Sequence, residues 1–233
     1  MAINVKSHPF FPEIYWVTLE DGSRKLGTKN LVPEKAVYGE RLVNFKGSEY
    51  RLWDPYRSKL AAGILKGLDS VPIYPNQKVL YLGAASGTTA SHVSDIVGEE
   101  GHVYCVEFAS RSLRELVNSV AAFRYNMTPI LADARLPESY SRMVERVNSV
   151  YCDVAQPEQA RILADNADMF LADDGWVILT IKAQSIDVTK EPSVVFQKEI
   201  AILESRGFCV SQVVGLEPFD KAHVMVVAQK MAK

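Results

Sequence analysis

The sequence feature that most constrains the fold is an apolar run that ends in a glycine-containing turn. Residues 79–85 read Val-Leu-Tyr-Leu-Gly-Ala-Ala, and Ser-Gly-Thr-Thr follows at 86–89. This pattern predicts a buried strand, a tight loop and the first turn of a helix. Gly83 and Gly87 carry no Cβ, so the loop would let a nucleotide-like ligand approach the bare backbone. The alternative for the two glycines is a purely structural turn.

A second apolar run, from His102 to Glu107, ends in an acid twenty positions after Gly87. At the tip of the second strand of a Rossmann-like unit, such an acid accepts hydrogen bonds from ribose hydroxyls. The loop reads Gly-x-x-x-Gly and lacks the full Gly-x-Gly-x-x-Gly pattern, which disfavours a dinucleotide with its pyrophosphate. S-adenosylmethionine, which has a ribose and an adenine but a sulfonium in place of phosphates, is therefore the favoured cofactor.

Composition and charge narrow the class of protein. The 233 residues are 48% hydrophobic and carry a net charge of −2, which suits one well-buried α/β domain with some residues left over. A chain of this charge does not coat nucleic acid by bulk electrostatics, so RNA binding would need clustered basic residues or a partner. Cys105, Cys152 and Cys209 lie in apolar, strand-like contexts, which predicts buried thiols and neither disulfides nor a zinc site. No segment predicts a signal peptide or a membrane span, and we expect a cytoplasmic protein without a bound metal.

The sequence pattern changes near residue 53 from short β-type runs to alternating helices and strands, and we expect two domains, 1–52 and 53–233. The first contains short β-type runs such as 14–18, an Asp-Gly hairpin turn at 21–22, and prolines that argue against helix. This pattern predicts a small antiparallel β module, too short to bury much core of its own.

From residue 53 onward the pattern alternates between helix and strand. We expect helices near 58–68, 88–97, 110–123, 138–146, 157–171 and 193–206, and strands near 79–84, 102–107, 127–132, 149–154 and 176–182. The last two apolar runs, 208–216 and 223–229, are joined by too few residues for a crossover helix and should form an antiparallel hairpin. The fold class predicted is therefore α/β: a Rossmann-like, mostly parallel sheet with helices on both faces, ending in the antiparallel hairpin found in many methyltransferases.

Polar and turn-forming residues follow each predicted strand, where ligands bind in open α/β sheets. We expect Glu107 to hold the ribose, Phe108 to pack on the adenine, Asp133 to accept from its amino group, and the backbone amide of Ala134 to reach a ring nitrogen. Helix capping is the alternative for Asp133. The full set of candidate cofactor-binding residues is Gly83, Ala84, Ala85, Gly87, Thr88, Thr89, Glu107, Phe108, Asp133, Ala134, Asp153 and Gln156.

Lys182 follows the strongly apolar run 176–181, which places it at the ligand edge of the sheet. Asp153 ends the adjacent strand and is the expected charge partner of Lys182, although helix capping is its alternative. Lys59 lies in a basic and aromatic cluster that suits a nucleic-acid backbone, but it could equally be a solvated lysine. His223 begins the last strand, and a lone histidine there is more often structural than catalytic.

Six ordered motifs resemble fibrillarin, and they cover nearly the whole chain. They are Leu-Trp-Asp-Pro-Tyr-Arg-Ser-Lys-Leu-Ala-Ala at 52–62, Tyr-Leu-Gly-Ala-Ala-Ser-Gly-Thr-Thr at 81–89, Val-Glu-Phe-Ala-Ser at 106–110, Ala-Asp-Ala-Arg at 132–135, Tyr-Cys-Asp-Val-Ala-Gln-Pro at 151–157 and Ile-Lys-Ala at 181–183. The Gly/Arg-rich N-terminal tail of the eukaryotic members is missing, so the chain is similar to the shorter archaeal form.

The resemblance implies an RNA ribose 2′-O-methyltransferase that uses S-adenosylmethionine within box C/D ribonucleoprotein particles and acts on pre-rRNA and tRNA. The catalytic Lys-Asp-Lys-His set of the family falls on Lys59, Asp153, Lys182 and His223, of which His223 rests on a looser motif. We expect Lys182 nearest the 2′-oxygen with Asp153 orienting it. Lys59 would stabilise developing charge or grip a phosphate, and His223 would support them.

The partners that the resemblance implies are a Nop-domain scaffold protein, a kink-turn-binding protein of ribosomal type, a box C/D guide RNA and the target RNA. Because intrinsic RNA affinity should be weak at this net charge, we expect little activity from the chain alone. One alternative is a non-catalytic, cofactor-binding scaffold subunit of a ribonucleoprotein. Another is a small-molecule methyltransferase, which would require a domain that caps the substrate.

Overall fold

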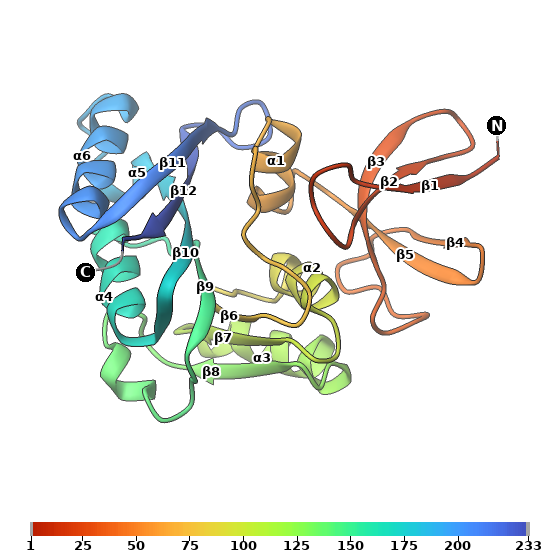
Figure 1. The fold of residues 1–233 in the computed structure, drawn as a ribbon, viewed down its shortest axis with the longest axis horizontal. Coiled ribbons are helices and arrows are strands. Elements are labelled where there is room, and N and C mark those ends of the chain that lie inside the picture. The colour runs from red at the N-terminus through yellow and green to blue at the C-terminus, as the bar shows by residue number, and fades with distance from the viewer. Residues whose placement is uncertain (1, 232–233) are drawn as a thin grey trace.

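The computed structural model describes residues 2–231. Its N-terminal part is an antiparallel sheet at one side of the molecule, with the strand order β1-β2-β3-β5-β4 (Figure 1). The strands are β1 (Asn4–Ser7), β2 (Ile14–Thr18), β3 (Arg24–Lys29), β4 (Leu42–Phe45) and β5 (Ser48–Trp53). The predicted antiparallel module is confirmed, while the division between residues 52 and 53 stays a prediction.

The rest of the chain is built on a seven-stranded sheet with the order β11-β12-β10-β9-β6-β7-β8. The run from β10 to β8 is parallel, and β12 pairs antiparallel with both β10 and β11. The strands are β6 (Lys78–Leu82), β7 (His102–Glu107), β8 (Met127–Leu131), β9 (Val147–Cys152), β10 (Leu171–Lys182), β11 (Phe208–Gly215) and β12 (His223–Lys230). The predicted α/β fold with its terminal hairpin is confirmed.

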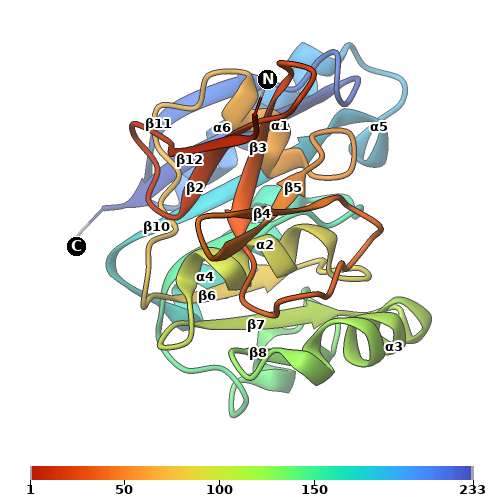
Figure 2. The same cartoon turned by 90° about the vertical axis from the view of Figure 1, so that its right-hand side faces the viewer.

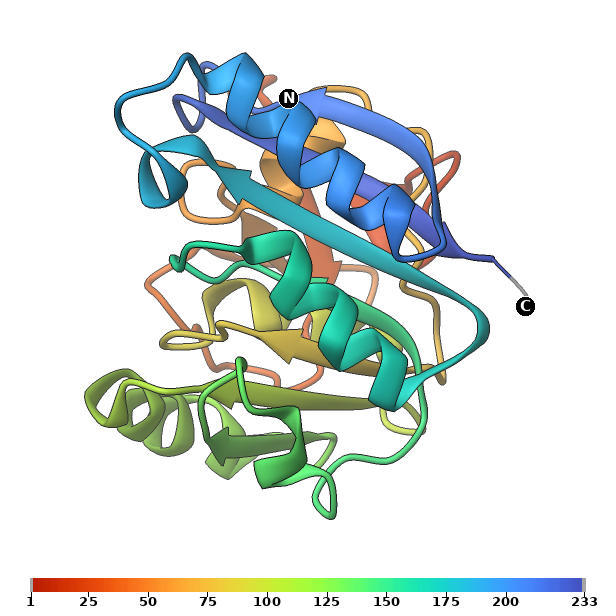
Figure 3. The ribbon, with the colours of Figure 1, turned by 90° about the vertical axis from the view of Figure 1, so that its left-hand side faces the viewer.

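Helices cover both faces of this sheet (Figures 1 and 3). One face carries α1 (Lys59–Leu65), α2 (Thr88–Val97) and α3 (Ser110–Ser119), and the other carries α4 (Gln159–Phe170) and α6 (Pro192–Ser205). Shorter turns are α5 (Ala183–Ile186), η1 (Ala121–Phe123) and η2 (Pro137–Tyr140). None of the helices described between residues 2 and 231 is both long and apolar enough to span a membrane.

Each face of the large sheet buries its own apolar cluster. The cluster under α1 and α2 includes Phe11, Ile14, Leu26 and Trp53 of the N-terminal module, whereas the cluster under α4 and α6 contains residues of the larger part only. The module's separate cluster has three buried residues among those that the structure describes, Val17, Leu19 and Val43. The module therefore depends on the larger part for most of its buried apolar surface, as its length predicts.

A buried polar network joins the module to α2, which lies behind it in Figure 2. The Asp95 carboxylate on α2 accepts hydrogen bonds from Arg51 Nη1 at 2.9 Å, Arg124 Nη1 at 2.6 Å and Thr28 Oγ1 at 2.7 Å. The Asp95 and Arg51 side chains are fully buried, and Arg124 is 2% exposed. Because buried charges are stable only when they are paired, this network fixes how the module sits on α2.

One predicted helix, 138–146, is wrong. The structure has only the single 3-10 turn η2, followed by irregular backbone up to β9. The hydroxyls of Ser139 and Ser141 donate to the carbonyls of Leu136 and Glu138. Such side-chain bonds to nearby backbone compete with helical hydrogen bonds and favour turns.

The prediction of three buried cysteines is wrong at one position. Cys105 and Cys152 lie on the central strands β7 and β9 and are buried, and burial raises the pKa of the Cys152 thiol to about 12. Cys209 lies on the edge strand β11 and is exposed. An edge strand keeps one face partly open, so an apolar sequence context there does not ensure burial.

Candidate active site

The loops after β6, β7, β8 and β9 enclose a cavity of about 300 Å³ at the carboxyl edge of the parallel strands. The same edge of β6 and β7 is visible in Figure 2. Its lining combines apolar side chains, backbone and a few polar groups: Gly83, Ala85, Val106, Glu107, Phe108, Ala109, Ser112, Ala132, Asp133, Ala134, Arg135, Asp153, Val154, Ala155, Gln156 and Ile162. A concave, mainly apolar site with a few convergent polar groups is the usual form of a cofactor site.

Most of the residues predicted to bind a cofactor line this cavity, and four do not. Ala84, Gly87, Thr88 and Thr89 are absent from its lining. Thr89 is buried and donates from Oγ1 to Ser58 Oγ at 2.9 Å, and Ser58 is the N-cap of α1. Thr89 therefore joins α2 to α1, and its predicted contact with the cofactor stays a prediction.

The glycines of the loop after β6 are required by packing and backbone conformation. Gly83 has φ +80° and Gly87 has φ +95°, in the left-handed region that favours glycine. A Cβ at Gly83 would lie 2.6 Å from the carbonyl oxygen of Asp153, and one at Gly87 would lie 2.5 Å from Leu116 Cδ1. Neighbouring protein atoms therefore require glycine at both positions. Gly83 also lines the cavity, and the expectation that this bare backbone approaches a ligand stays a prediction.

Glu107 is held by the backbone of two cavity loops. Its Oε2 accepts from the Ala85 N–H at 2.9 Å, and its Oε1 accepts from the Ala109 N–H at 2.8 Å. The residue is only 7% exposed. Each carboxylate oxygen has a further acceptor site, so Glu107 can also accept from the two hydroxyls of a ribose in the cavity.

Phe108 and Asp133 line the same cavity, but the Phe108 ring is exposed whereas the Asp133 carboxylate is held by a neighbouring arginine. Phe108 is 62% exposed, so one face of its ring is open to a planar ligand. Arg135 holds Asp133 through hydrogen bonds from Nε and Nη2 and lowers the pKa of its carboxyl. Sequence reasoning did not include Arg135, although the Asp-Ala-Arg spacing that brings the two side chains together is visible in the sequence.

Beside the cavity, Asp153 forms an ion pair with Lys59. The Lys59 Nζ lies 3.0 Å from Asp153 Oδ2 and 3.9 Å from Asp220 Oδ2. Asp153 follows β9, Lys59 begins α1 and Asp220 lies in the turn before β12. The pair is about one-quarter exposed, so it lies at the surface of the site where a large substrate can reach it.

His223 and Lys182 are the other two residues of the predicted catalytic set. His223 Nδ1 lies 3.0 Å from Asp220 Oδ1 and 2.7 Å from the Lys221 carbonyl oxygen, and its buried Nε2 has no hydrogen-bond partner among the residues described. Lys182 is the direct register partner of His223 across β10 and β12. The structure thus places Lys59, Asp153, Lys182 and His223 around one corner of the sheet, as their sequence motifs suggest.

The expected pairing of Asp153 with Lys182 is wrong. Asp153 is paired with Lys59, and Lys182 makes no ion pair with any residue between 2 and 231. The reason is the position of α1, which brings Lys59 across to the end of β9 from 94 positions away. Asp220 is the acid that sequence reasoning missed, and its only signal was its place three residues before His223.

Comparison with known proteins agrees with this architecture. A family model described as Fibrillarin matches residues 5–232. A fibrillarin-like rRNA/tRNA 2′-O-methyltransferase of Staphylothermus marinus is 55% identical over 232 residues, covering 100% of this chain and 99% of the relative.

Two solved structures are similar over almost their full length. One is the fibrillarin of Aeropyrum pernix with natively bound S-adenosyl-L-methionine, at 52% identity and a TM-score of 0.91, covering 98% of this chain and 99% of that one. The other is a fibrillarin in complex with Nop5p, at 40% identity and a TM-score of 0.84, covering 95% of this chain and 99% of that one. Since both the family model and these identities extend over nearly all residues, the chain belongs to the fibrillarin family.

Proposed function

We propose that this protein transfers the methyl group of S-adenosylmethionine to ribose 2′-hydroxyls of pre-rRNA and tRNA, directed by box C/D guide RNA. One observation carries the proposal: Asp153 lines the nucleoside-sized cavity and is also the carboxylate that pairs with Lys59 at its rim. Cofactor site and charged cluster are therefore one continuous site. The names of the similar proteins, a 2′-O-methyltransferase and a fibrillarin with bound S-adenosylmethionine, support the same activity.

The cavity fits the nucleoside part of S-adenosylmethionine. Glu107 would accept from the ribose hydroxyls, since its carboxylate is fixed by two backbone N–H groups and retains acceptor capacity. The open face of Phe108 would pack on the adenine. Asp133 and the backbone amide of Ala134 would bind the adenine edge, and Gln156, which also lines the cavity, would contact the cofactor. The bound cofactor supplies an activated methyl group on a sulfonium.

The protein's own part in the reaction is positioning and charge stabilisation. A ribose 2′-hydroxyl is a poor nucleophile because its pKa is far above neutrality. Methyl transfer would join the 2′-oxygen to the methyl carbon, break the bond from that carbon to sulfur, and release the 2′-hydroxyl proton to water. The negative charge that loss of this proton leaves on the 2′-oxygen would need a cation nearby. Lys182 has no ion pair among residues 2–231 and would supply it. Lys59 would hold an adjacent phosphate or share that charge, kept in place by Asp153, while His223 supports Lys182 from the neighbouring strand.

A non-catalytic scaffold subunit is disfavoured by the same geometry. Four ionisable side chains from α1, the end of β9, the end of β10 and the start of β12 meet beside the cavity. A subunit that only bridged other proteins would have no use for such a group beside a cofactor.

We propose further that activity depends on partner proteins and RNA. A fibrillarin of similar structure was solved with Nop5p, which supports a Nop-domain scaffold for this chain as well. A kink-turn-binding protein and a box C/D guide RNA are the remaining partners that family membership implies. With a net charge of −2, the chain alone would neutralise few phosphates and bind RNA weakly.

The test is reconstitution with mapping of the methyl group. The chain is incubated with labelled S-adenosylmethionine, a guide RNA, a complementary target, a Nop-domain protein and a kink-turn-binding protein. The label should appear on one 2′-oxygen of the target, at the position that the guide specifies. Absence of label in the full mixture would reject the proposed activity, and equal rates with the chain alone would reject the dependence on partners.

A further inference from the structure

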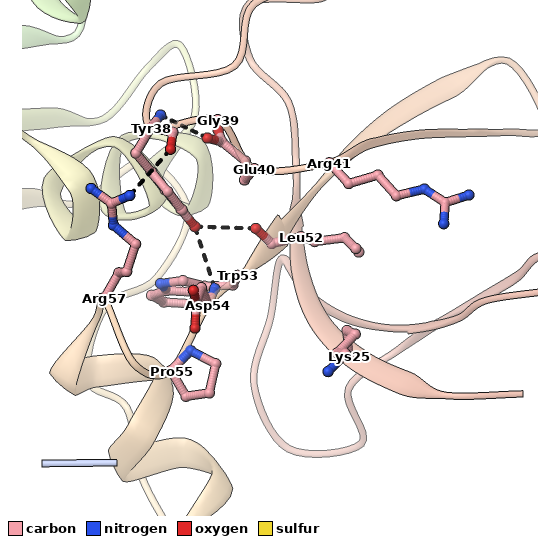
Figure 4. A pocket seen from close by; sticks show the side chains of 10 residues that line it. All are labelled: Lys25, Tyr38, Gly39, Glu40, Arg41, Leu52, Trp53, Asp54, Pro55 and Arg57. Atoms are coloured by element: carbon pink, nitrogen blue, oxygen red, sulfur yellow. Dashed lines mark hydrogen bonds between the residues drawn. The ribbon is translucent and has the colours of Figure 1, made fainter. Parts of the chain in front are cut away.

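A second cavity, of about 360 Å³ (Figure 4), shares no lining residue with the candidate cofactor cavity. It is formed where the N-terminal module meets the segment that leads into α1. Its lining is aromatic, basic and polar: Lys25, Tyr38, Gly39, Glu40, Arg41, Leu52, Trp53, Asp54, Pro55 and Arg57. Nothing in the reaction proposed above uses these residues.

The cavity is bordered by three exposed cations. Arg57 lies on one side, and Lys25 and Arg41 lie on the other (Figure 4). Arg41 is paired with Glu20 at 2.8 Å, whereas Lys25 and Arg57 make no ion pair with any residue from 2 to 231. An unpaired surface cation in a concave site attracts anionic ligands such as phosphates.

The acidic side chains of this cavity are already engaged. Glu40 is 2% exposed and accepts from the buried Arg51 Nε at 2.6 Å. Asp54 accepts through Oδ1 from the backbone N–H of Tyr56 at 2.9 Å. Both carboxylates are thus directed toward protein donors, and the open part of the surface is dominated by Arg57 and Lys25.

Arg57 is held in place by Tyr38. Its guanidinium lies 5.2 Å from the Tyr38 ring centre, and Nη1 donates to the Tyr38 carbonyl at 3.4 Å. The Tyr38 hydroxyl in turn donates to the Leu52 carbonyl and accepts from the Asp54 N–H. An arginine that is pre-positioned in this way loses less rotamer entropy when it binds a phosphate.

The same short segment connects this cavity to the active site. Arg57 lines the cavity and precedes the active-site Lys59 by two positions. Tyr56 is 69% exposed and packs edge-on against Phe219 with ring centres 5.2 Å apart. Phe219 is next to Asp220, which lies 3.9 Å from Lys59. The exposed Tyr56 and the partly buried Phe219 thus belong to the two chain segments that carry Arg57, Lys59 and Asp220.

We propose that these features form a docking track for the RNA strand that carries the methylated nucleotide. Lys25 and Arg57 hold phosphates beside the target position, and the Tyr56–Phe219 pair packs against the nucleotide next to it. Exposed cations with interleaved aromatic rings are the usual surface for a nucleic-acid strand because the backbone is anionic and each nucleotide offers an apolar face. This inference rests on the proposed function, and it assigns strand binding to residues outside the catalytic group.

The test uses the reconstituted particle and measures methylation rate against target-RNA concentration. Lys25→Ala/Arg57→Ala should raise the half-saturating RNA concentration about tenfold at physiological salt and leave S-adenosylmethionine affinity unchanged. It should also make the negative slope of log affinity against log salt less steep, by about 0.7 for each phosphate that is no longer neutralised. The single variant Arg57→Lys keeps both positive charges, so its salt slope should stay close to that of the unmodified chain. Tyr56→Ala should raise the half-saturating concentration by a similar factor, since it removes an aromatic ring on which a nucleotide stacks, and Tyr56→Phe should not.

Matched controls come from the opposite edge of the sheet. Arg146 is exposed and precedes β9, and Tyr125 is fully exposed and precedes β8. Arg146→Ala and Tyr125→Ala should leave both the half-saturating concentration and the salt slope as in the unmodified chain. If the cavity variants behave like these controls, the track does not exist, although the unmodified particle would still be active. If they fail to assemble with the Nop-domain protein on gel filtration, the surface binds protein and the RNA proposal is overturned. A particle in which even the unmodified chain is inactive would instead refute the proposed function.

Discussion

Replacing Asp95 with alanine should remove the anionic centre that holds the N-terminal module on α2. The substitution leaves two buried guanidinium groups facing an apolar methyl. Arg51 keeps a second carboxylate, since Glu40 lies 2.6 Å from its Nε. Arg124 retains only neutral acceptors, Ser94 Oγ at 3.1 Å and Asn30 Oδ1 at 3.4 Å. One buried cation is therefore left without a counter-charge.

The size of the effect follows from this burial. Removing one partner of a buried ion pair costs about 3–5 kcal/mol, because the remaining charge stays desolvated. The Leu31 N–H, which donates to Asp95 Oδ1 at 3.0 Å, also loses its acceptor. For a chain of this length, such a loss corresponds to a fall in Tm of roughly 6–20 °C.

The assay is urea denaturation at pH 7, supported by a thermal scan. The matched control is Asp173→Ala, because Asp173 is 99% exposed and pairs with the exposed Arg146 at 3.2 Å. Exposed pairs contribute about 0–1 kcal/mol, so the control should unfold almost as the unmodified chain does. A decrease of about 1 kcal/mol or less in the free energy of unfolding of Asp95→Ala, within the range of an exposed pair, would show that the network is not a major source of stability.

Four further outcomes are expected. Glu107→Ala should weaken S-adenosylmethionine binding by about 1–3 kcal/mol by calorimetry, because ribose hydroxyls lose a charged acceptor; equal affinities would remove Glu107 from the site. Lys182→Ala should abolish single-turnover methyl transfer in the assembled particle while cofactor affinity is retained, and near-normal turnover would contradict its role. Gly83→Ala should lower the free energy of unfolding in urea by at least about 1–2 kcal/mol, since φ is +80° and the new Cβ meets the Asp153 carbonyl at 2.6 Å; an unchanged midpoint would contradict this. Burial holds the pKa of His92 well below 6.5, so the unfolded chain binds more protons than the folded one below that pH. The free energy of unfolding should therefore fall as the pH drops from 6.5 to 5, by at most about 1.4 kcal/mol per pH unit from this residue. His92→Gln should flatten this pH dependence in urea titrations, and an equal slope would assign it to other groups.

The sequence by itself determined the elements of the large sheet and the loops that line its cavity. Alternation of apolar runs with helical spacing predicts β6, α2, β7 and the terminal hairpin, because each side chain's face depends only on the local period. Glu107 could be placed at a strand end for the same reason, and the structure holds its carboxylate between two loop amides there. Where local hydroxyls compete for the backbone, as at 138–146, the same reasoning predicted a helix that does not form.

Only the tertiary structure decided which charges meet. Strand ends suggest Lys182 as the partner of Asp153, but the docking of α1 across the sheet gives that place to Lys59 and adds Asp220. The roles of Gly83 and Gly87 were likewise decided by atoms of distant segments, the Asp153 carbonyl and the Leu116 side chain. The cationic cavity beside Tyr56 exists only because the N-terminal module packs on the segment before α1. Such interactions join residues far apart in the chain, so they depend on how whole elements pack, which the local sequence pattern does not specify.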